Sequence, residues 1–99
     1  MTEFYDSLET RSMDEREAAL FAALPEQVAL AKADAPAYAR LLAEVDPAAV
    51  TGRAALAKLP VTRKSELIDA QQSDPPFASL TATPLSEMRR VFASPGPIY

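Results

Sequence analysis

Alanine dominates the apolar part of this chain and limits the core that the chain can build. Apolar residues make up 48% of the 99 residues, but twenty of them are alanines with little surface to bury, and there is no tryptophan. A chain of this length forms at most one small domain, which hides a modest fraction of its surface on folding. The sequence therefore predicts a thin core, and a thin core favours a subdomain that packs against something else.

Two residue types that often carry chemistry are absent from the sequence. The chain has no cysteine, which excludes disulfides and thiolate chemistry and is typical of a reducing compartment. It has no histidine, which removes the usual general base and the commonest metal ligand. The remaining acids show no metal-ligand cluster and no nucleophile–base pair, so the sequence predicts no metal site.

The net charge of −4 is unevenly divided along the chain. Acids outnumber bases in residues 1–50, whereas bases outnumber acids in residues 51–99. The basic half suits an anion site, and chance clustering of surface charges is the alternative interpretation. We expect no nucleic-acid binding, because an acidic chain without a basic stripe is poorly suited to it.

The sequence also predicts where the protein is located. The first residues have neither the basic nor the apolar part of a signal peptide. No run approaches the roughly 18 apolar residues that a membrane span needs. We therefore expect a soluble, cytoplasmic protein that binds no membrane.

A long helix is predicted after an irregular lead-in. Ser12 and Glu15 have the spacing of a capping box, and apolar residues then keep helical spacing to about residue 33. Because proline in a helix interior costs about 3 kcal/mol, we expect a kink or a break at Pro25. The lead-in offers three side chains that could anchor it to the core: Phe4, Tyr5 and Leu8.

Three further helices and one strand complete the prediction. The second helix begins near Pro36, since proline suits a first turn. Thr51 is the predicted N-cap of the third helix, and Thr62 is the predicted N-cap of the fourth. Residues 1–72 thus form a helical N-terminal subdomain of about four helices, and the fold class is mainly α. Residues 73–99 are an extended segment and then a strand at 89–93, which needs partner strands for its ladder. We expect those partners in a sheet beyond this chain.

The predicted start of the fourth helix is one candidate phosphate site. Arg63 and Lys64 stand beside the free N–H groups of a helix that Thr62 would cap. Such N–H groups and two cations together suit a phosphate. A routine helix start with solvated cations is the alternative interpretation.

The loop after the predicted strand is a second candidate. The Ser94 hydroxyl and the Gly96 N–H are groups that bind phosphate in loops of this kind. An ordinary turn is the alternative, since Pro95 and Pro97 each remove a backbone donor.

Taken together, ordered segments of this chain resemble the N-terminal part of phenylacetate–CoA ligases, which belong to the acyl-adenylate-forming superfamily. The resemblance covers essentially the whole chain in the order of the family. It is carried by Ala-Pro-Ala-Tyr-Ala-Arg-Leu-Leu at 35–42, Val-Asp-Pro at 45–47, Leu-Pro-Val-Thr-Arg-Lys-Ser-Glu-Leu at 59–67, Asp-Pro-Pro-Phe at 74–77 and Arg-Val-Phe-Ala-Ser at 90–94.

The resemblance implies a two-step ligase of aromatic catabolism. ATP with Mg²⁺ and an aryl acid such as phenylacetate give an acyl-adenylate, and CoA then displaces AMP to form the thioester. The family's lysine falls on Lys64, which would approach the ATP phosphates and stabilise their charge as they are displaced. Ser94 and Gly96 fall on the family's phosphate loop, whose usual Ser-Ser-Gly-Thr-Thr-Gly is here Ser-Pro-Gly-Pro-Ile-Tyr. This departure puts ATP-dependent adenylation in doubt.

The resemblance also sets expectations for the chain taken alone. Residues 73–99 would belong to a larger adenylation domain, so the 99-residue chain would be an inactive N-terminal fragment that binds no cofactor. A homodimer through the N-terminal helices is a further implication. Two alternatives stay open: a small helical dimerisation or interaction module without catalysis, and a degenerate ligase homologue that binds an aryl-CoA without making one.

Overall fold

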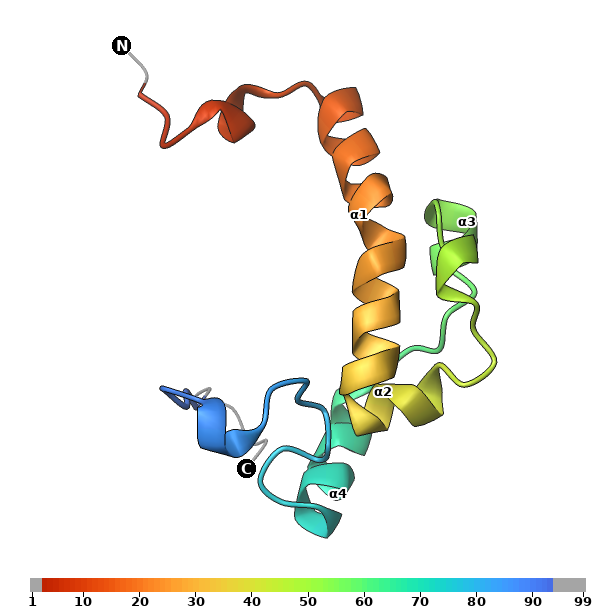
Figure 1. The fold of residues 1–99 in the computed structure, drawn as a ribbon, viewed down its shortest axis with the longest axis vertical. Helices are drawn as coiled ribbons and strands as arrows, with labels where there is room; N and C mark the ends of the chain where they lie inside the picture. Colours follow the sequence, from red (N-terminus) through yellow and green to blue (C-terminus); the bar gives the residue numbers. More distant parts are fainter. Residues whose placement is uncertain (1–2, 94–99) are drawn as a thin grey trace.

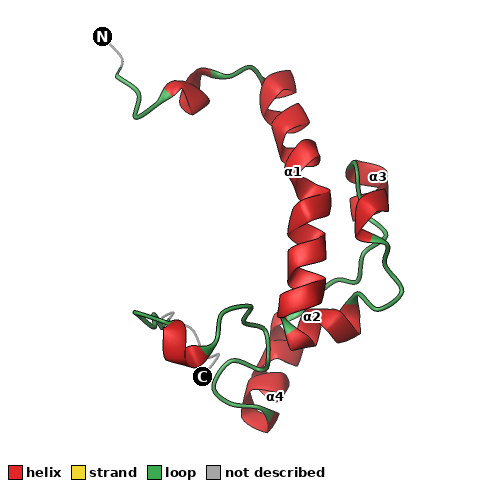
Figure 2. Ribbon diagram, in the orientation of Figure 1, coloured by secondary structure: helices red, strands yellow, loops and turns green. Residues whose placement is uncertain are grey.

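The computed structural model describes residues 3–93, which fold into helices joined by short connections (Figures 1 and 2). The helices are α1 (Met13–Asp34), α2 (Pro36–Leu41), α3 (Arg53–Leu56) and α4 (Lys64–Ser73), with 3-10 helices at Ser7–Thr10, Pro47–Ala49 and Leu85–Glu87. Within residues 3–93 there is no strand. The mainly α fold class is therefore confirmed.

The predicted strand at residues 89–93 is not present as a strand. This segment has no regular secondary structure and its side chains are exposed. A strand forms where a neighbour pairs with its backbone, and the described part of the chain supplies no such neighbour. The sheet itself was expected beyond this chain, so that part of the prediction stays a prediction.

The long helix α1 begins at a complete capping box. The Glu15 N–H donates to Ser12 Oγ at 3.1 Å, and the Ser12 N–H donates to Glu15 Oε2 at 2.8 Å. Each residue thus satisfies a backbone donor of the other. The predicted start of this helix is confirmed.

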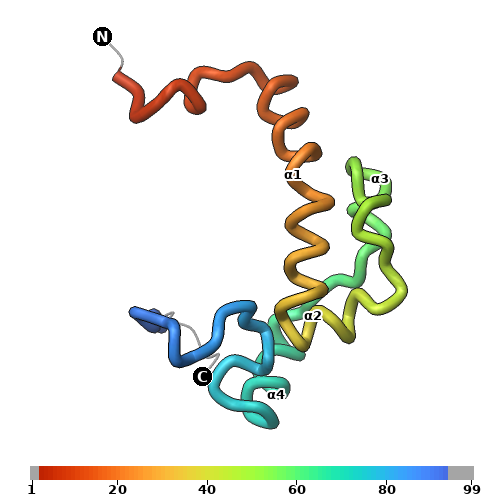
Figure 3. The backbone as a smooth tube through the Cα atoms, viewed as in Figure 1, coloured from red at the N-terminus to blue at the C-terminus, as the bar shows by residue number. Residues whose placement is uncertain are grey.

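Of the kink or break expected at Pro25, the break does not occur, because α1 runs from Met13 to Asp34 as one helix with this proline inside it (Figure 3). Proline removes its own N–H and therefore only one bond of the helical ladder. Alanines before it favour the helix, and Leu24 and Val28 on either side pack into the core. Burial of these two side chains favours one continuous helix over the cost of the proline.

The core lies where α1 meets α2 and the segment that follows it. Val28, Leu42 and Val50 are its buried members. Four half-buried side chains pack around them: Leu24, Tyr38, Val45 and Leu59. No side chain in residues 3–93 is completely buried, which agrees with the thin core expected from the alanine content.

Lys32 ties the end of α1 to the turn that follows α2. Its Nζ donates to the Val45 carbonyl at 2.8 Å and to the Ala43 carbonyl at 3.3 Å. Carbonyls just after a helix end lack helical partners, and a cation there is favourable. This contact links the end of α1 to the turn after α2 from outside the core cluster.

Two predicted N-caps are displaced by one residue. The cap of α3 is Gly52 and not Thr51, and it makes no side-chain bond. The cap of α4 is Arg63 and not Thr62. Here the Glu66 carboxylate accepts from the Arg63 N–H at 3.4 Å. A side chain of the first helical turn thus satisfies the backbone donor of the N-cap residue.

The lead-in does not reach the core, and the expectation that it is anchored there is wrong. Phe4, Tyr5 and Leu8 are all more than half exposed. The Asp6 side chain accepts from the Leu8 N–H at 2.9 Å and starts a one-turn helix. This local bond holds the segment in its own turn, which extends away from α1 (Figure 1).

We predict that Leu42→Ala lowers the free energy of unfolding by about 2–5 kcal/mol. The substitution removes buried apolar atoms and leaves a cavity that the few surrounding side chains cannot fill. Leu85, which is 55% exposed, provides the matched control, and Leu85→Ala should change this free energy by no more than about 0.5 kcal/mol. Urea unfolding followed by circular dichroism measures both. Equal losses in the two variants would contradict this placement of the core.

Candidate functional site

Lys64, the predicted catalytic residue, is the first residue of α4 and is exposed. Its neighbour Arg63 is exposed as well, and the ion pair found within residues 3–93 engages neither of them. Two cations therefore stand at a helix start, where backbone N–H groups favour anions. Glu66 in the same turn adds a negative charge and occupies the Arg63 N–H, so this end of α4 attracts anions less than its cations alone would.

The other two predicted site residues, Ser94 and Gly96, lie outside the described residues. The segment that leads to them has no regular secondary structure up to residue 93. Lys64 is thus the one predicted site residue within residues 3–93. The structure places no second predicted site residue beside it.

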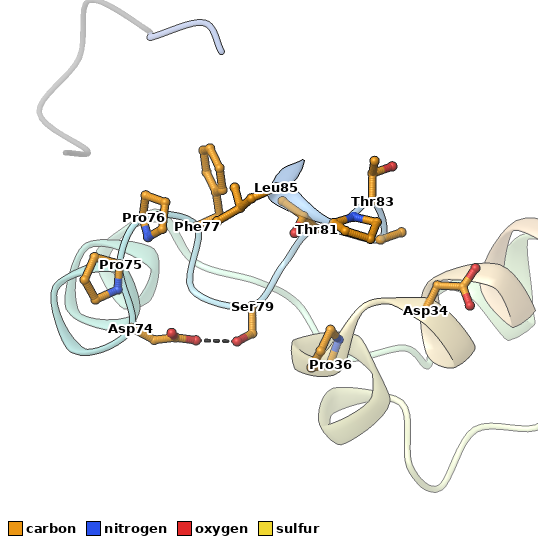
Figure 4. A pocket seen from close by; sticks show the side chains of 12 residues that line it. Asp34, Pro36, Asp74, Pro75, Pro76, Phe77, Ser79, Thr81, Thr83 and Leu85 are labelled. Atoms are coloured by element: carbon orange, nitrogen blue, oxygen red, sulfur yellow. Dashed lines mark hydrogen bonds between the residues drawn. The ribbon is translucent and has the colours of Figure 1, made fainter. Parts of the chain in front are cut away.

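A shallow hollow lies between the end of α1 and the loop after α4 (Figure 4), with a volume of about 330 Å³. Two carboxylates line it, those of Asp34 and Asp74. The Ser79 hydroxyl donates to the Asp74 carboxylate, so this acid is already engaged. No group of three or more metal-ligating side chains occurs within residues 3–93, and the hollow does not have the ligands of a metal site.

The loop at 74–80 lines one side of this hollow and contacts α2. The Ala37 N–H, which is in the first turn of α2, donates to the Ser79 carbonyl at 2.9 Å. Within the loop, the Ala78 N–H donates to the Asp74 carbonyl at 2.8 Å. Ala78 and Ser79 both have left-handed backbone conformations, with φ of 54° and 57°. The loop thus links α4 to α2 and through α2 to the core.

A small groove separates α2 from α4. Its volume is about 310 Å³, and its walls are mostly apolar. Arg40 and Glu66 supply one charge of each sign. Leu41 and Val61 line the same groove and are exposed, so this surface is suited to contact with apolar groups of another protein surface.

A second groove, of about 490 Å³, lies between α1 and α3. Arg53 Nε donates to Glu17 Oε1 at 2.6 Å, and the Arg53 guanidinium lies 5.7 Å from the centre of the Phe21 ring. A cation at this distance over a ring is attracted by its face. These contacts connect α3 to the N-terminal half of α1, and the groove beside them is lined mainly by apolar side chains.

The exposed face of α1 carries a feature that the sequence-based prediction missed. Six residues recur at alternate steps of three and four and are all exposed, and we call them the outer stripe: Met13, Arg16, Leu20, Ala23, Gln27 and Leu30. Met13, Leu20 and Leu30 are 78%, 63% and 49% exposed. This spacing is that of the contact positions of a coiled coil, and it was visible in the sequence.

Among residues 3–93, no helix is both long and apolar enough to cross a bilayer.

Comparisons with known proteins assign no family to this chain. No family model matches it, and neither a curated protein nor a solved structure matches it significantly. The arguments about function therefore depend on the chain's own residues and surfaces.

We predict that Ala78→Val destabilises the chain, because a β-branched residue is strongly disfavoured at positive φ. Ala78→Gly should be tolerated, since glycine adopts this conformation without steric cost. Thermal unfolding of the two variants beside the wild type compares them. A higher midpoint for the valine variant than for the glycine variant would contradict the left-handed conformation at this position.

Proposed function

We propose that this chain is the N-terminal helical part of a cytoplasmic phenylacetate–CoA ligase-like enzyme, which converts an aryl acid through an acyl-adenylate into its CoA thioester. The observation that carries the proposal is the position of Lys64. It is exposed at the first position of α4, within the segment that resembles the family's lysine-containing segment. ATP with Mg²⁺, CoA and the aryl acid would bind to the complete protein.

The chemistry of Lys64 suits this role. A lysine ammonium is a compact charge on a flexible stem, and it can follow the phosphates as the acid displaces pyrophosphate. Positive charge held where negative charge develops lowers the barrier of such a step. The chain's own part in the reaction would be to position this cation.

The helix that carries Lys64 is connected to the rest of the fold. α4 is linked to α2 through the loop bond between Ala37 and Ser79, and α2 leads directly to the core residue Leu42. The backbone that carries Lys64 is therefore connected to the most buried part of the structure. The exposed apolar side chains along the α2–α4 groove suit a subdomain that packs against the rest of a larger enzyme.

A helical interaction module without catalysis is the second candidate function. The outer stripe of α1 favours it, because a row of exposed residues at coiled-coil spacing, four of which are apolar, is suited to pairing with another helix. This function needs neither ATP nor a catalytic residue.

A degenerate ligase homologue that binds an aryl-CoA without forming it remains a third possibility. The two prolines of the sequence at 94–99 motivate it, since each lacks an N–H for a phosphate. ATP–pyrophosphate exchange by the complete protein would exclude this function.

We predict that Lys64→Ala in the complete enzyme slows adenylation by about 10²–10³-fold, the usual loss when one group that stabilises developing charge is removed. Binding of the aryl acid should change much less, because the cation faces the phosphates. ATP–pyrophosphate exchange measures the first quantity and equilibrium binding of the acid the second.

Lys58→Ala is the matched control for this experiment. Lys58 is an exposed lysine in the segment that precedes α4, and its removal should leave the exchange rate unchanged. A wild-type exchange rate in the Lys64→Ala enzyme would overturn the role of Lys64.

A further inference from the structure

We propose that the groove between α1 and α3 binds a small amphipathic anion, a carboxylate with an apolar tail of medium length. The ligand's tail would lie against the apolar side chains of the groove, and Arg16 would bind its carboxylate. This site lies on different helices from Lys64, so ligand binding there requires neither ATP nor the complete enzyme.

The groove has the size and the lining of a site for a small ligand. Its volume of about 490 Å³ lies within the range of about 300–1,000 Å³ that is usual for such sites. Arg53 on α3 contacts Glu17 and Phe21 on α1, so the two helices that form the groove lie side by side (Figure 1). Most of the lining is apolar and comes from five side chains: Met13, Leu20, Phe21, Leu24 and Leu56.

Much of this apolar lining is left in water by the chain itself. Met13, Leu20 and Leu56 are all exposed, although they line one groove together. Covering apolar surface of this kind is favourable in proportion to the area that leaves water. A ligand with an apolar tail would therefore gain free energy from the groove whatever the charge of its head group.

The charged side chains of the groove select an anionic head group. Two cations and one anion line it, namely Arg16, Arg53 and Glu17. The hollow beside the loop after α4 is lined by Asp34 and Asp74 instead, and the α2–α4 groove has one charge of each sign. In a chain with a net charge of −4, the α1–α3 groove thus combines an apolar lining with an excess of positive charge, which complements an anion.

Arg16 is the cation available to that anion. The Glu17 carboxylate already accepts from Arg53 and pairs with it. Arg16 is exposed, and the ion pair found within residues 3–93 does not include it. A guanidinium binds a carboxylate well because it can donate two parallel hydrogen bonds to the two oxygens.

The spacing along α1 sets the length of the ligand. Arg16, Leu20 and Leu24 follow one another at steps of four residues and line the same groove, so they form one row on the helix. Leu24 lies about 12 Å from Arg16 along the helix axis, at 1.5 Å per residue. A carboxylate bound by Arg16 can therefore extend a medium-length tail along this row.

The proposed site overlaps the outer stripe, because Met13, Arg16 and Leu20 belong to both. A ligand in the groove and a helix paired along the outer stripe would compete for these side chains. Ligand titrations are therefore made at a low and constant concentration of the chain, which limits such pairing.

Octanoate, octanol and octylammonium test the proposal, because they carry the same tail and differ in the charge of the head group. Each is titrated into the isotope-labelled 99-residue chain, and the backbone amide shifts are followed by NMR. Octanoate should bind about tenfold more tightly than octanol, the usual gain from a charge-assisted hydrogen bond. Octylammonium should bind more weakly than octanol, and the octanoate shifts should be largest at residues 13–24 and 53–56.

Arg16→Gln tests the role of the cation, since glutamine removes the charge and keeps a polar side chain. This variant should bind octanoate about tenfold more weakly and octanol unchanged. Arg40→Gln is the matched control, because Arg40 is an exposed arginine of the α2–α4 groove, and it should leave both affinities unchanged. Circular dichroism checks that each variant keeps its helices.

Equal affinities for octanoate and octanol would overturn the proposal, because apolar contact alone would then explain the binding. Shifts centred on the α2–α4 groove, or an equal loss of octanoate affinity in Arg16→Gln and Arg40→Gln, would overturn it as well. Octanoate shifts that do not saturate would show that the groove binds no such ligand. None of these outcomes bears on the adenylation test of Lys64, so the two proposals fail separately.

Discussion

The contact of α1 with the segment after α2 is the interaction on which the rest of the structure depends. Val28, Leu42 and Val50 are buried there, and Lys32 adds two bonds to carbonyls at its edge. The loop at 74–80 holds α4 against α2, and α3 is held to α1 by Arg53. With so little apolar area at the centre, the chain gains only modest stability from its own core.

Local chemistry is what the sequence allowed us to predict. The capping box at Ser12 and the helix starting at Pro36 depend on neighbouring residues alone, and both are present. The helix does not break at Pro25, one of the two outcomes expected there, because packing of Leu24 and Val28 against residues distant in the sequence favours a continuous helix. The exposure of Phe4 and Tyr5 could not be predicted either, because burial of a side chain depends on where the rest of the chain lies and not on its neighbours in the sequence.

The candidate site could be predicted only in part. Lys64 was singled out from its place beside a helix start, and it is exposed there. The outer stripe of α1 was missed, although its seven-residue spacing was readable, because spacing alone does not say which face the rest of the chain covers. The two features lie on different helices and share no residue, so one chain can both present Lys64 and pair through α1.

The most direct test is the dependence of unfolding on chain concentration. Urea unfolding followed by circular dichroism would be measured over a wide range of concentrations of the wild-type chain. If a thin core is completed by pairing through α1, the midpoint rises with concentration, because a partner that binds only the folded state stabilises it by mass action. A midpoint that is the same at every concentration would show that the chain folds without a second copy.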